Sequence, residues 1–408
     1  MIESLPVYYE KVPNLAQELE NSGNLAVLVL DASRFAAIEE QYGTETYMAV
    51  RQRIFKLFAD QSGKEFREED ILALDEPRGL RFILFLGRKR KATPNVYANL
   101  ESLRERLASV FIPKLARTAL PYLKNPPDIS IGIGLALHNP LVHPHRIIVR
   151  ALREAYEHAD WQRCADDLQV RQRLQEIILR GRVVTAFQPI VRIQDRKALG
   201  FEALSRGAPG TSLQSADLLF GAAIKHNLLV ELDRLCRMRA LLCSNRLPAD
   251  VQIFVNTLPA TIRDPEFRGK HLIGFLEKAK VTPNRIVIEI TEKLVIENLS
   301  LFQDAMSYFT DLGMALAVDD VGSGYSGLET IARLRPAYLK VDTALVRDVH
   351  VSLVNREMLK AIISLGRGIG SRVIAEGIQT AEELNTLLSM GVEYGQGFYL
   401  GRPELLPE

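Results

Sequence analysis

From about Arg171 to its C-terminus, the chain repeats one pattern that few folds can accommodate. Short runs rich in Val, Ile, Leu and Ala alternate with helical segments of ordinary length, which is typical of βαβ units with parallel strands. About eight such runs fit into roughly 235 residues, close to the ~250 residues of a (β/α)8 barrel. The sequence therefore predicts an α/β protein with a C-terminal (β/α)8 barrel over residues 174–408, whose strands are 184–191, 198–204, 251–256, 285–291, 315–320, 337–342, 372–377 and 394–398.

Acidic, amide or lysine side chains stand near the carboxyl end of most of these strands. In a closed barrel of parallel strands, all the carboxyl ends surround one mouth, and active sites are built there. Groups that are distant in the sequence are therefore expected to converge at this mouth. The set is Glu202, Asn256, Glu289, Asp319, Asp320, Lys340, Asp342, Glu376 and Gln396.

So many carboxylates in one place would repel one another and raise one another's pKa unless a cation lies among them. Oxygen ligands without Cys or His favour Mg²⁺ or Mn²⁺ over zinc. The number of carboxylates exceeds what one ion needs, which favours a two-metal site for an in-line displacement at phosphorus. A single Asp or Glu at a strand end is more often a helix cap or a solvated loop residue, so the argument depends on agreement across several strands.

Two further features accompany the acidic strand ends. The segment 321–327 (VGSGYSG) contains three glycines and is expected to be a tight or mobile loop, a candidate lid over the site. Arg206 follows the strand that carries Glu202 and could bind a phosphate with two parallel hydrogen bonds. An ordinary surface arginine is the equal alternative.

The first region, residues 1–160, has a different pattern. Apolar runs at 24–31, 70–74, 80–86 and 128–137 predict strands, and helical periodicity over 35–58 and 96–110 predicts the helices between them. A turn is expected at 75–79. The helix that begins after His145 continues towards Arg180 with little loop signal. We therefore expect a mixed α/β domain and a helical connector over 161–173, followed by the barrel over 174–408.

Charge and cysteine content exclude several classes of protein. Lys and Arg total 51 against 50 Asp and Glu, so the net charge is +1, and a protein that coats polymeric nucleic acid needs a basic excess. Three cysteines form neither a disulfide framework nor a zinc pattern. The N-terminus lacks a signal peptide, and no apolar run of ~18 residues predicts a membrane span. The expected location is the cytoplasm, without membrane partners.

Short motifs in the second region resemble the EAL domain family. They are FEALSR at 201–206, VN at 255–256, EITE at 289–292, DDVGSGYS at 319–326, KVD at 340–342, AEG at 375–377 and GQGFYLGRP at 395–403. The order and spacing of these motifs agree with those of the EAL domain family from about Leu174 to Pro403. The resemblance implies a TIM-like barrel that hydrolyses cyclic di-GMP to linear 5′-pGpG with Mg²⁺ or Mn²⁺.

The resemblance also implies a role for each matching residue. The implied metal ligands are Glu202, Asn256, Glu289, Asp319 and Asp320. The implied catalytic residues are Glu376, as general base or ligand, Lys340, which orients water or stabilises charge, and Glu292, which holds the loop after Asp320. The implied substrate-binding or site-lining residues are Gln188, Arg206, Gln396 and Asp342. Two departures, Val321 for phenylalanine and Gly327 for serine, concern the loop and its regulation.

The first region resembles a degenerate GGDEF domain through Asp31, Phe35, Tyr42-Gly43 and the SIGI run at 130–133. The signature turn is replaced by DEPRGLR at 75–81. Without its glycines and acidic pair, diguanylate cyclase activity is not expected. Asp31 is interpreted as a structural remnant of a metal position.

Two hypotheses of different classes follow. The first is a cyclic di-GMP phosphodiesterase regulated by a non-catalytic N-terminal domain, with a homodimer through the EAL domain by analogy. The alternative is a non-hydrolysing receptor that binds cyclic di-GMP and signals to a protein partner; a scaffold that binds neither is a third. The complete set of acidic, amide and lysine residues favours the enzyme.

Overall fold

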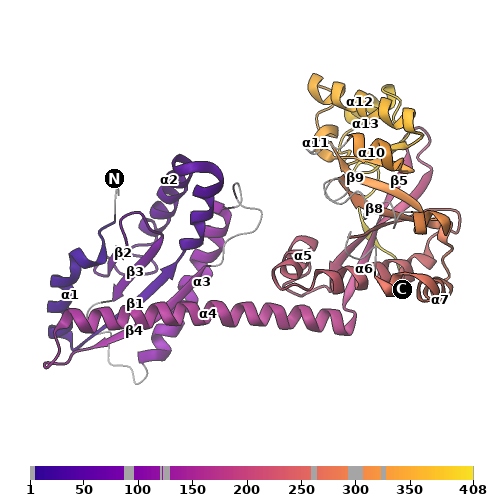
Figure 1. Cartoon of the computed structure of the whole chain (residues 1–408). Helices are drawn as coiled ribbons and strands as arrows, with labels where there is room; N and C mark the ends of the chain where they lie inside the picture. The colour runs from indigo at the N-terminus through magenta and orange to yellow at the C-terminus, as the bar shows by residue number, and fades with distance from the viewer. Residues whose placement is uncertain are drawn as a thin grey trace. The chain divides into compact units, whose positions relative to one another are not determined.

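The computed structural model describes residues 5–86, 96–119, 122, 129–258, 264–292, 307–322 and 328–407. Residues 323–327 of the glycine-rich loop lie outside these ranges. The chain divides into two compact units, Met1–Val170 and Arg171–Glu408, which are described separately below (Figure 1).

The N-terminal unit is built on a four-stranded antiparallel sheet in the order β2-β3-β1-β4. With α2 between β1 and β2, and α3 between β3 and β4, this is the split βαβ arrangement of ferredoxin-like folds. The turn expected at 75–79 joins β2 to β3. The elements are α1 (Tyr8–Ser22), β1 (Asn24–Asp31), η1 (Ser33–Ala36), α2 (Ala37–Ala59), β2 (Ile71–Leu74), β3 (Arg81–Leu86), α3 (Val96–Ala119), β4 (Ser130–Leu137) and α4 (Pro144–Arg180).

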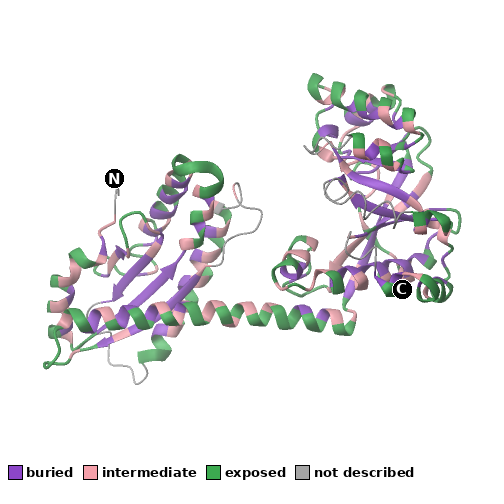
Figure 2. Cartoon of the chain, viewed as in Figure 1, coloured by how far each residue is buried: buried purple, intermediate pink, exposed green. Residues whose placement is uncertain are grey.

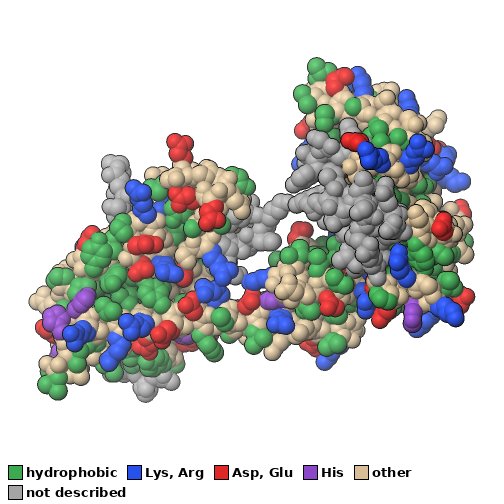
Figure 3. All heavy atoms as spheres, viewed as in Figure 1, with side chains coloured by type: hydrophobic (Ala, Val, Ile, Leu, Met, Phe, Trp, Pro, Cys, Tyr) green, Lys and Arg blue, Asp and Glu red, His purple; other side chains and the backbone are tan. Residues whose placement is uncertain are grey.

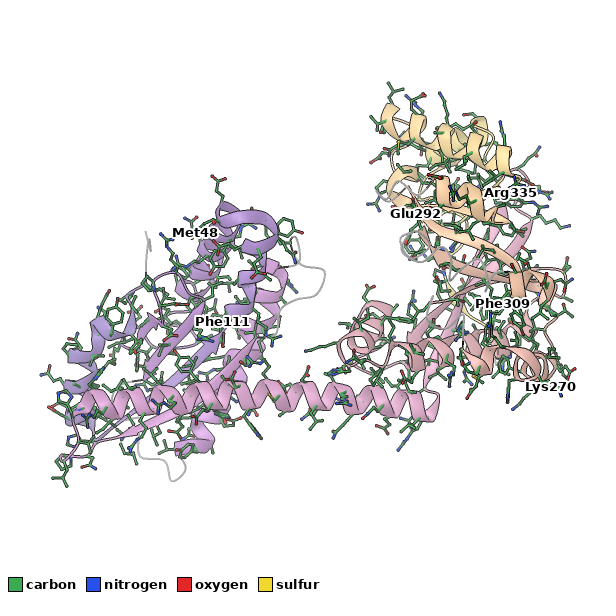
Figure 4. The ribbon with its side chains drawn as sticks, in the orientation of Figure 1. Met48, Phe111, Lys270, Glu292, Phe309 and Arg335 are labelled. Carbon is green, nitrogen blue, oxygen red and sulfur yellow. The ribbon has the colours of Figure 1, made fainter. Side chains whose placement is uncertain are left out.

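Alternation along β1 gives this sheet two apolar faces. Leu28 and Leu30 face α2 and α3, while Val27 and Val29 face α1 and α4. On the first face, the ring of Phe111 (labelled in Figure 4) stacks on Phe58 at 4.4 Å between centroids. The continuous helix expected from Phe35 is wrong in detail. A short 3-10 turn precedes α2, and Gly43 breaks the helix with φ of 82°, a value that glycine adopts without steric cost.

Helix α4 packs against the backbone of β4 where β4 has glycines. A Cβ added at Gly134 would lie 2.0 Å from the carbonyl oxygen of Ala151, and one at Gly132 would lie 1.9 Å from that of Ala155. Beyond this contact, most side chains of residues 161–173 are exposed or half-buried (Figure 2). Helix α4 continues through them without interruption to Arg180.

Substituting Gly134 by Ala should therefore destabilise the protein by about 2–3 kcal/mol, because the backbone of α4 cannot move away from β4 without separating the packed core. Urea unfolding of the full chain, followed by circular dichroism, measures the change. The matched control is Gly368→Ala in α12 (Leu353–Ile369), where a Cβ meets nothing within 4 Å. This control should stabilise by about 0.4–1 kcal/mol. Equal effects of the two substitutions would contradict the packing argument.

The C-terminal unit is a closed barrel of eight strands, from β5 to β12, in sequence order around the barrel. Pairing of β12 with β5 closes it, and β13 pairs with β5 further along, at Ala186 and Phe187. The barrel strands are β5 (Val183–Arg192), β6 (Ala198–Gly207), β7 (Gln252–Asn256), β8 (Ile286–Thr291), β9 (Ala315–Val321), β10 (Tyr338–Val341), β11 (Arg372–Ala375) and β12 (Tyr394–Gly395), followed by β13 (Glu404–Leu405).

Helices surround this barrel and bury an apolar layer between themselves and the strands. They are α5 (Ala216–Lys225), α6 (Leu229–Cys243), η2 (Ser244–Arg246), η4 (Pro265–Phe267), α7 (Gly269–Ala279), η5 (Pro283–Arg285), α10 (Leu328–Leu334), α11 (Thr343–Val346), α12 and α13 (Ala381–Ser389).

The predicted barrel is confirmed, but the expectation of parallel strands throughout is wrong for β5. Strand β5 runs antiparallel to both of its neighbours, β6 and β12. The reason is the short link between Arg192 and Ala198, because a parallel pair needs a crossover of a dozen or more residues. From β6 to β12 the successive pairs are parallel, and their carboxyl ends meet at one mouth.

The surface agrees with the balanced composition. On the face drawn in Figure 3, acidic and basic side chains are interspersed over each unit. Among the described residues, no helix combines the length and the apolar character that crossing a bilayer requires.

Candidate functional site

The site is a ring of polar side chains directly above the apolar interior of the barrel. The interior contains Phe254, Val287, Ala317, Tyr338, Ile374, Tyr394 and Ile190. Two residues further towards the mouth, each of these strands or its continuation carries a polar side chain. Because successive side chains alternate across a strand, a residue two positions on points the same way. Together with Glu202 of β6, the ring is Gln188, Glu202, Asn256, Glu289, Asp319, Lys340, Glu376 and Gln396.

Lys340 lies at the centre of this ring and is fully buried. Its Nζ lies 2.7 Å from Glu289 Oε1 and 2.7 Å from Glu376 Oε1. The same atom lies 3.3 Å from Glu202 Oε2 and 3.4 Å from Asp319 Oδ1. Within the described part of the chain, no other cation pairs with these four carboxylates, so one positive charge faces four acidic groups.

Amide side chains hold Glu202 in place from both sides. Asn256 Nδ2 donates to Glu202 Oε1 at 3.0 Å, and Gln396 Nε2 donates to Oε2 at 2.6 Å. Gln396 also donates to Gln188 Oε1, whose own amide donates to the Gly401 carbonyl. Residues from β5, β6, β7 and the segment after β12 are thereby joined in one network.

Burial and crowding set the pKa values of the carboxyl groups. Burial raises the pKa of Glu289 and of Glu376 well above the usual range, and it raises the pKa of Asp319 as well. Burial would also raise the pKa of Glu202, but the Lys340 ammonium and the two amide hydrogen bonds lower it overall. The carboxylates in turn hold the pKa of Lys340 well above its ordinary value, although its burial acts in the opposite direction.

Asp320 extends the acidic cluster towards the mouth. Its backbone is left-handed, with φ of 57°. One carboxylate oxygen from each of Asp319, Asp320 and Glu376 lies within 4.8 Å of the others. Burial and the neighbouring Asp319 charge raise the pKa of Asp320 to about 6. These oxygens are close enough to share a cation.

The donor set fits a hard divalent cation. Every ligating group is a carboxylate or amide oxygen, which Mg²⁺ and Mn²⁺ prefer. Oε1 of buried Glu289 lies 2.7 Å from Lys340 Nζ, whereas its Oε2 accepts no hydrogen bond from the described residues. A buried carboxylate oxygen without a donor is costly, and one ammonium faces four carboxyl groups, so the residues present suit an ion in addition to Lys340.

Three of the predicted site residues serve neighbouring structure. Glu292, labelled in Figure 4 and 1% exposed, follows β8 and accepts the Gly322 backbone N–H at 3.0 Å. Asp342 accepts the Ala344 N–H at 2.6 Å and caps α11. Arg206 donates to the Ser205 carbonyl at 2.9 Å. The functional roles expected for these three stay predictions.

Two cavities flank β6 at the mouth. The first, of about 280 Å³, includes Glu202, Asp319, Glu376 and Gln396 in its wall. The second, of about 290 Å³, reaches from Asn256 and Glu289 past Arg206 to α5 and α6. A bulky ligand could therefore extend to both sides of the acidic ring. Wall residues that the sequence reasoning missed are Thr343, Gln379 and Phe398 in the first cavity, and Phe220, Asp233 and Cys236 in the second.

Some of the missed residues had a signal in the sequence. Thr343, Gln379 and Phe398 each follow a strand-end residue by one to three positions, so a wider window at the strand ends would have included them. Phe220 and Cys236 lie on helices α5 and α6, and only the closed fold brings them to the mouth.

Fold and site together define a class of protein: an α/β barrel with a cluster of oxygen donors, suited to divalent cations, at the carboxyl ends of its strands. The sequence model of the EAL domain matches residues 171–403, more than half of the chain. The chain belongs to the EAL domain family.

Several relatives have known names. Signaling protein YkoW of Bacillus subtilis is 28% identical over 56% of this chain and 29% of its own length. Two proteins of Pseudomonas aeruginosa match across 95% of the chain. They are the bifunctional diguanylate cyclase/cyclic di-GMP phosphodiesterase MucR, 24% identical over 57% of its length, and the cyclic di-GMP phosphodiesterase NbdA, 25% identical over 50%. The chain thus spans 29% to 57% of the length of these relatives.

Solved structures support the fold. The phosphodiesterase PaMucR in complex with c-di-GMP is 25% identical, with a TM-score of 0.53 over 58% of this chain and 98% of that one. The EAL domain of FimX from Xanthomonas citri, in complex with c-diGMP, is 21% identical, with a TM-score of 0.54 over 59% of this chain and 96% of that one. The second likeness concerns the fold alone.

Proposed function

We propose that the protein hydrolyses cyclic di-GMP to linear 5′-pGpG in a reaction that depends on Mg²⁺ or Mn²⁺. The observation that carries this proposal is the complete ring at the barrel mouth, in which every strand contributes a polar group and four carboxylates surround Lys340. The names of two relatives support cyclic di-GMP as the substrate, because MucR and NbdA are both cyclic di-GMP phosphodiesterases.

Two ions would be held by Glu202, Asn256, Glu289, Asp319 and Asp320. When bound, such ions polarise phosphoryl oxygens and lower the pKa of water. Glu376, whose pKa burial raises, accepts the proton of the attacking water. Lys340 stabilises the negative charge that develops on the phosphoryl oxygens as the water oxygen bonds to phosphorus and the bond from phosphorus to the 3′ oxygen breaks. The 3′ oxygen takes up a proton from solvent and leaves as a hydroxyl group. Arg206, Gln188, Gln396 and Asp342 contact the substrate.

Incubation of the full chain with cyclic di-GMP and Mn²⁺, followed by chromatography, tests this function. Linear pGpG should accumulate with wild-type protein and not when EDTA replaces the metal. Absence of pGpG from well-folded protein at saturating metal would contradict the proposal. Tight binding without product would instead support the non-hydrolysing receptor.

The N-terminal unit is proposed to be a degenerate GGDEF-like domain without cyclase activity. The matches to MucR and NbdA extend over this unit, because they cover 95% of the chain. Arg81 Nε lies 3.2 Å from Asp31 Oδ2, and its Nη1 lies 3.7 Å from Asp75 Oδ2. A guanidinium thus neutralises Asp31, where an active domain would need a metal ion. Regulation of the barrel by this unit, and a homodimer through the barrel, belong to the same proposal; sedimentation analysis tests the dimer.

Divalent cations should stabilise the protein more at alkaline than at acidic pH. The metal must displace protons from carboxyl groups whose pKa values are raised, including Asp320 at about 6. Metal affinity therefore rises with pH through this range and is weak below it. At a metal concentration of about 100 times Kd, the expected gain is about 2.7 kcal/mol. Thermal unfolding with Mg²⁺ or with EDTA, at about pH 5.5 and pH 8 and constant ionic strength, measures the gain. A gain equal at both pH values would refute the assignment of these carboxylates as ligands.

A further inference from the structure

A third cleft, of about 250 Å³, lies outside the acidic ring but within the barrel unit. It forms between the last turns of α4 and the loop that joins β6 to α5. Its wall consists of Arg173, Glu176, Ile177, Arg182, Gly210, Thr211, Ser212 and Leu213. No motif of the sequence analysis includes these residues, and the proposed hydrolysis does not use them.

The charges of this cleft favour an anion. Among the residues that the structure describes, no carboxylate lies within ion-pair distance of Arg173 or Arg182. Arg173 Nη1 donates to a neutral group, the hydroxyl oxygen Oγ of Ser212, at 3.1 Å. The one acidic group of the wall, Glu176, is paired with Arg180 at 3.1 Å. Two guanidinium groups thus face one cleft without a counter-ion from the described residues.

The donor chemistry favours a phosphoryl group in particular. A guanidinium presents parallel N–H groups that match two oxygens of a phosphate, and two such groups can share its three free oxygens. The hydroxyl of Ser212, which accepts a hydrogen bond from Arg173, adds a neutral donor to the wall. Ile177 and Leu213 are buried side chains in the wall, and they offer an apolar surface to the body of a ligand. The volume lies below the ~300–1,000 Å³ of drug-sized sites, so the ligand is small.

We propose that this cleft binds the phosphoryl group of a small organic phosphate, such as a nucleoside monophosphate. The position gives such binding a consequence for the barrel. The loop at 208–215 continues directly from β6, which carries Glu202 and Arg206, and the opposite wall is the end of the long helix α4. A bound phosphate bridges α4 to the strand that carries Glu202.

Calorimetric titration of the full chain in EDTA tests this proposal, since without metal the acidic ring repels anions. Inorganic phosphate, adenosine 5′-monophosphate and adenosine are the probes, with chloride at matched ionic strength as the blank. We expect adenosine 5′-monophosphate to bind most tightly, inorganic phosphate more weakly, and adenosine not at all. Adenosine binding as tightly as its monophosphate, or no heat from either phosphate, would overturn the proposal.

Variants of the cleft locate the binding. Arg182→Gln and Arg173→Gln should each weaken binding of adenosine 5′-monophosphate at least tenfold, while Glu176→Gln should strengthen it several-fold. The matched control is Arg333→Gln, an exposed arginine of α10 that pairs with Glu329. An equal loss with Arg333→Gln would show general charge attraction and refute the site. Because the titration contains no metal and no cyclic di-GMP, its failure leaves the proposed hydrolysis untouched, and loss of hydrolysis leaves the cleft untouched.

Discussion

Replacing Asp319 by Asn should reduce turnover of cyclic di-GMP by at least about 10³-fold while the protein stays folded. Loss of residues that only support metal ligands costs about 10–100-fold, and Asp319 is placed as a ligand itself. Its carboxylate is close to Asp320 and Glu376 and lies 3.4 Å from Lys340 Nζ. Asn keeps the shape of the side chain but removes the charge that would hold the cation. A steady-state assay with Mn²⁺, followed by chromatography of the product, measures the loss.

Measurements of stability distinguish loss of a metal ligand in the Asn variant from misfolding. Burial raises the pKa of Asp319, so in the folded protein the ionised form is disfavoured. The stability associated with this group is present at low pH and falls as pH rises through the raised pKa. Without metal at pH 8, the Asn variant should therefore be as stable as wild type or more stable, whereas the stabilisation by added metal should be much smaller. Asp195→Asn, at the exposed link between β5 and β6, is the control for loss of one charge. A variant that keeps its full metal-induced shift would show that Asp319 is no ligand.

The acidic ring could be predicted because the position of a residue at the carboxyl end of a strand is enough to place it at the barrel mouth. Polar residues at the carboxyl ends of parallel strands meet at one mouth whatever their distance in the sequence. At its edges the rule also selects residues that lie outside the ring. Asp342 lies one residue beyond β10, and its carboxylate caps α11. Asp320 directly follows the ring residue Asp319, so the alternation of side chains along a strand predicts that it points away from the ring. Asp320 instead has a left-handed backbone, and its carboxylate lies beside those of Asp319 and Glu376.

Other features could not be derived from periodicity. The reversed direction of β5 follows from the short link to β6. The sequence shows the length of this link, but the hydrophobic patterns that predict strands do not take it into account. The central place of Lys340 depends on distances across the barrel to Glu289 and Glu376. The cavity wall on α5 and α6 depends on how these helices pack outside β6.

Replacing Lys340 by Met should have the second large effect, on both stability and turnover. Met keeps most of the volume of the side chain but removes the buried ammonium 2.7 Å from both Glu289 and Glu376. Removing one partner of a buried ion pair typically costs about 3–5 kcal/mol. Without the ammonium, the pKa values of the surrounding carboxyl groups rise further, including that of Glu202, which Lys340 lowers in wild type. The metal-free variant is therefore expected to be most stable at acidic pH and to lose stability as pH rises, more steeply than wild type.

Divalent metal should restore much of this stability at pH 8, because the ions replace the missing positive charge. Turnover should nevertheless stay at least about 10²-fold below wild type, because the negative charge that develops on the phosphoryl oxygens loses its stabilising group. Urea unfolding at about pH 5.5 and pH 8, with Mg²⁺ or with EDTA, together with the turnover assay, measures both effects. Lys360→Met is the matched control, because Lys360 is exposed and pairs with Glu357 on the surface of α12. If Lys340→Met lost stability equally at both pH values, or recovered full turnover with metal, the ammonium would be neither the counter-charge of the ring nor part of the chemistry. Recovery of stability without recovery of turnover is the result that assigns both roles to this one side chain.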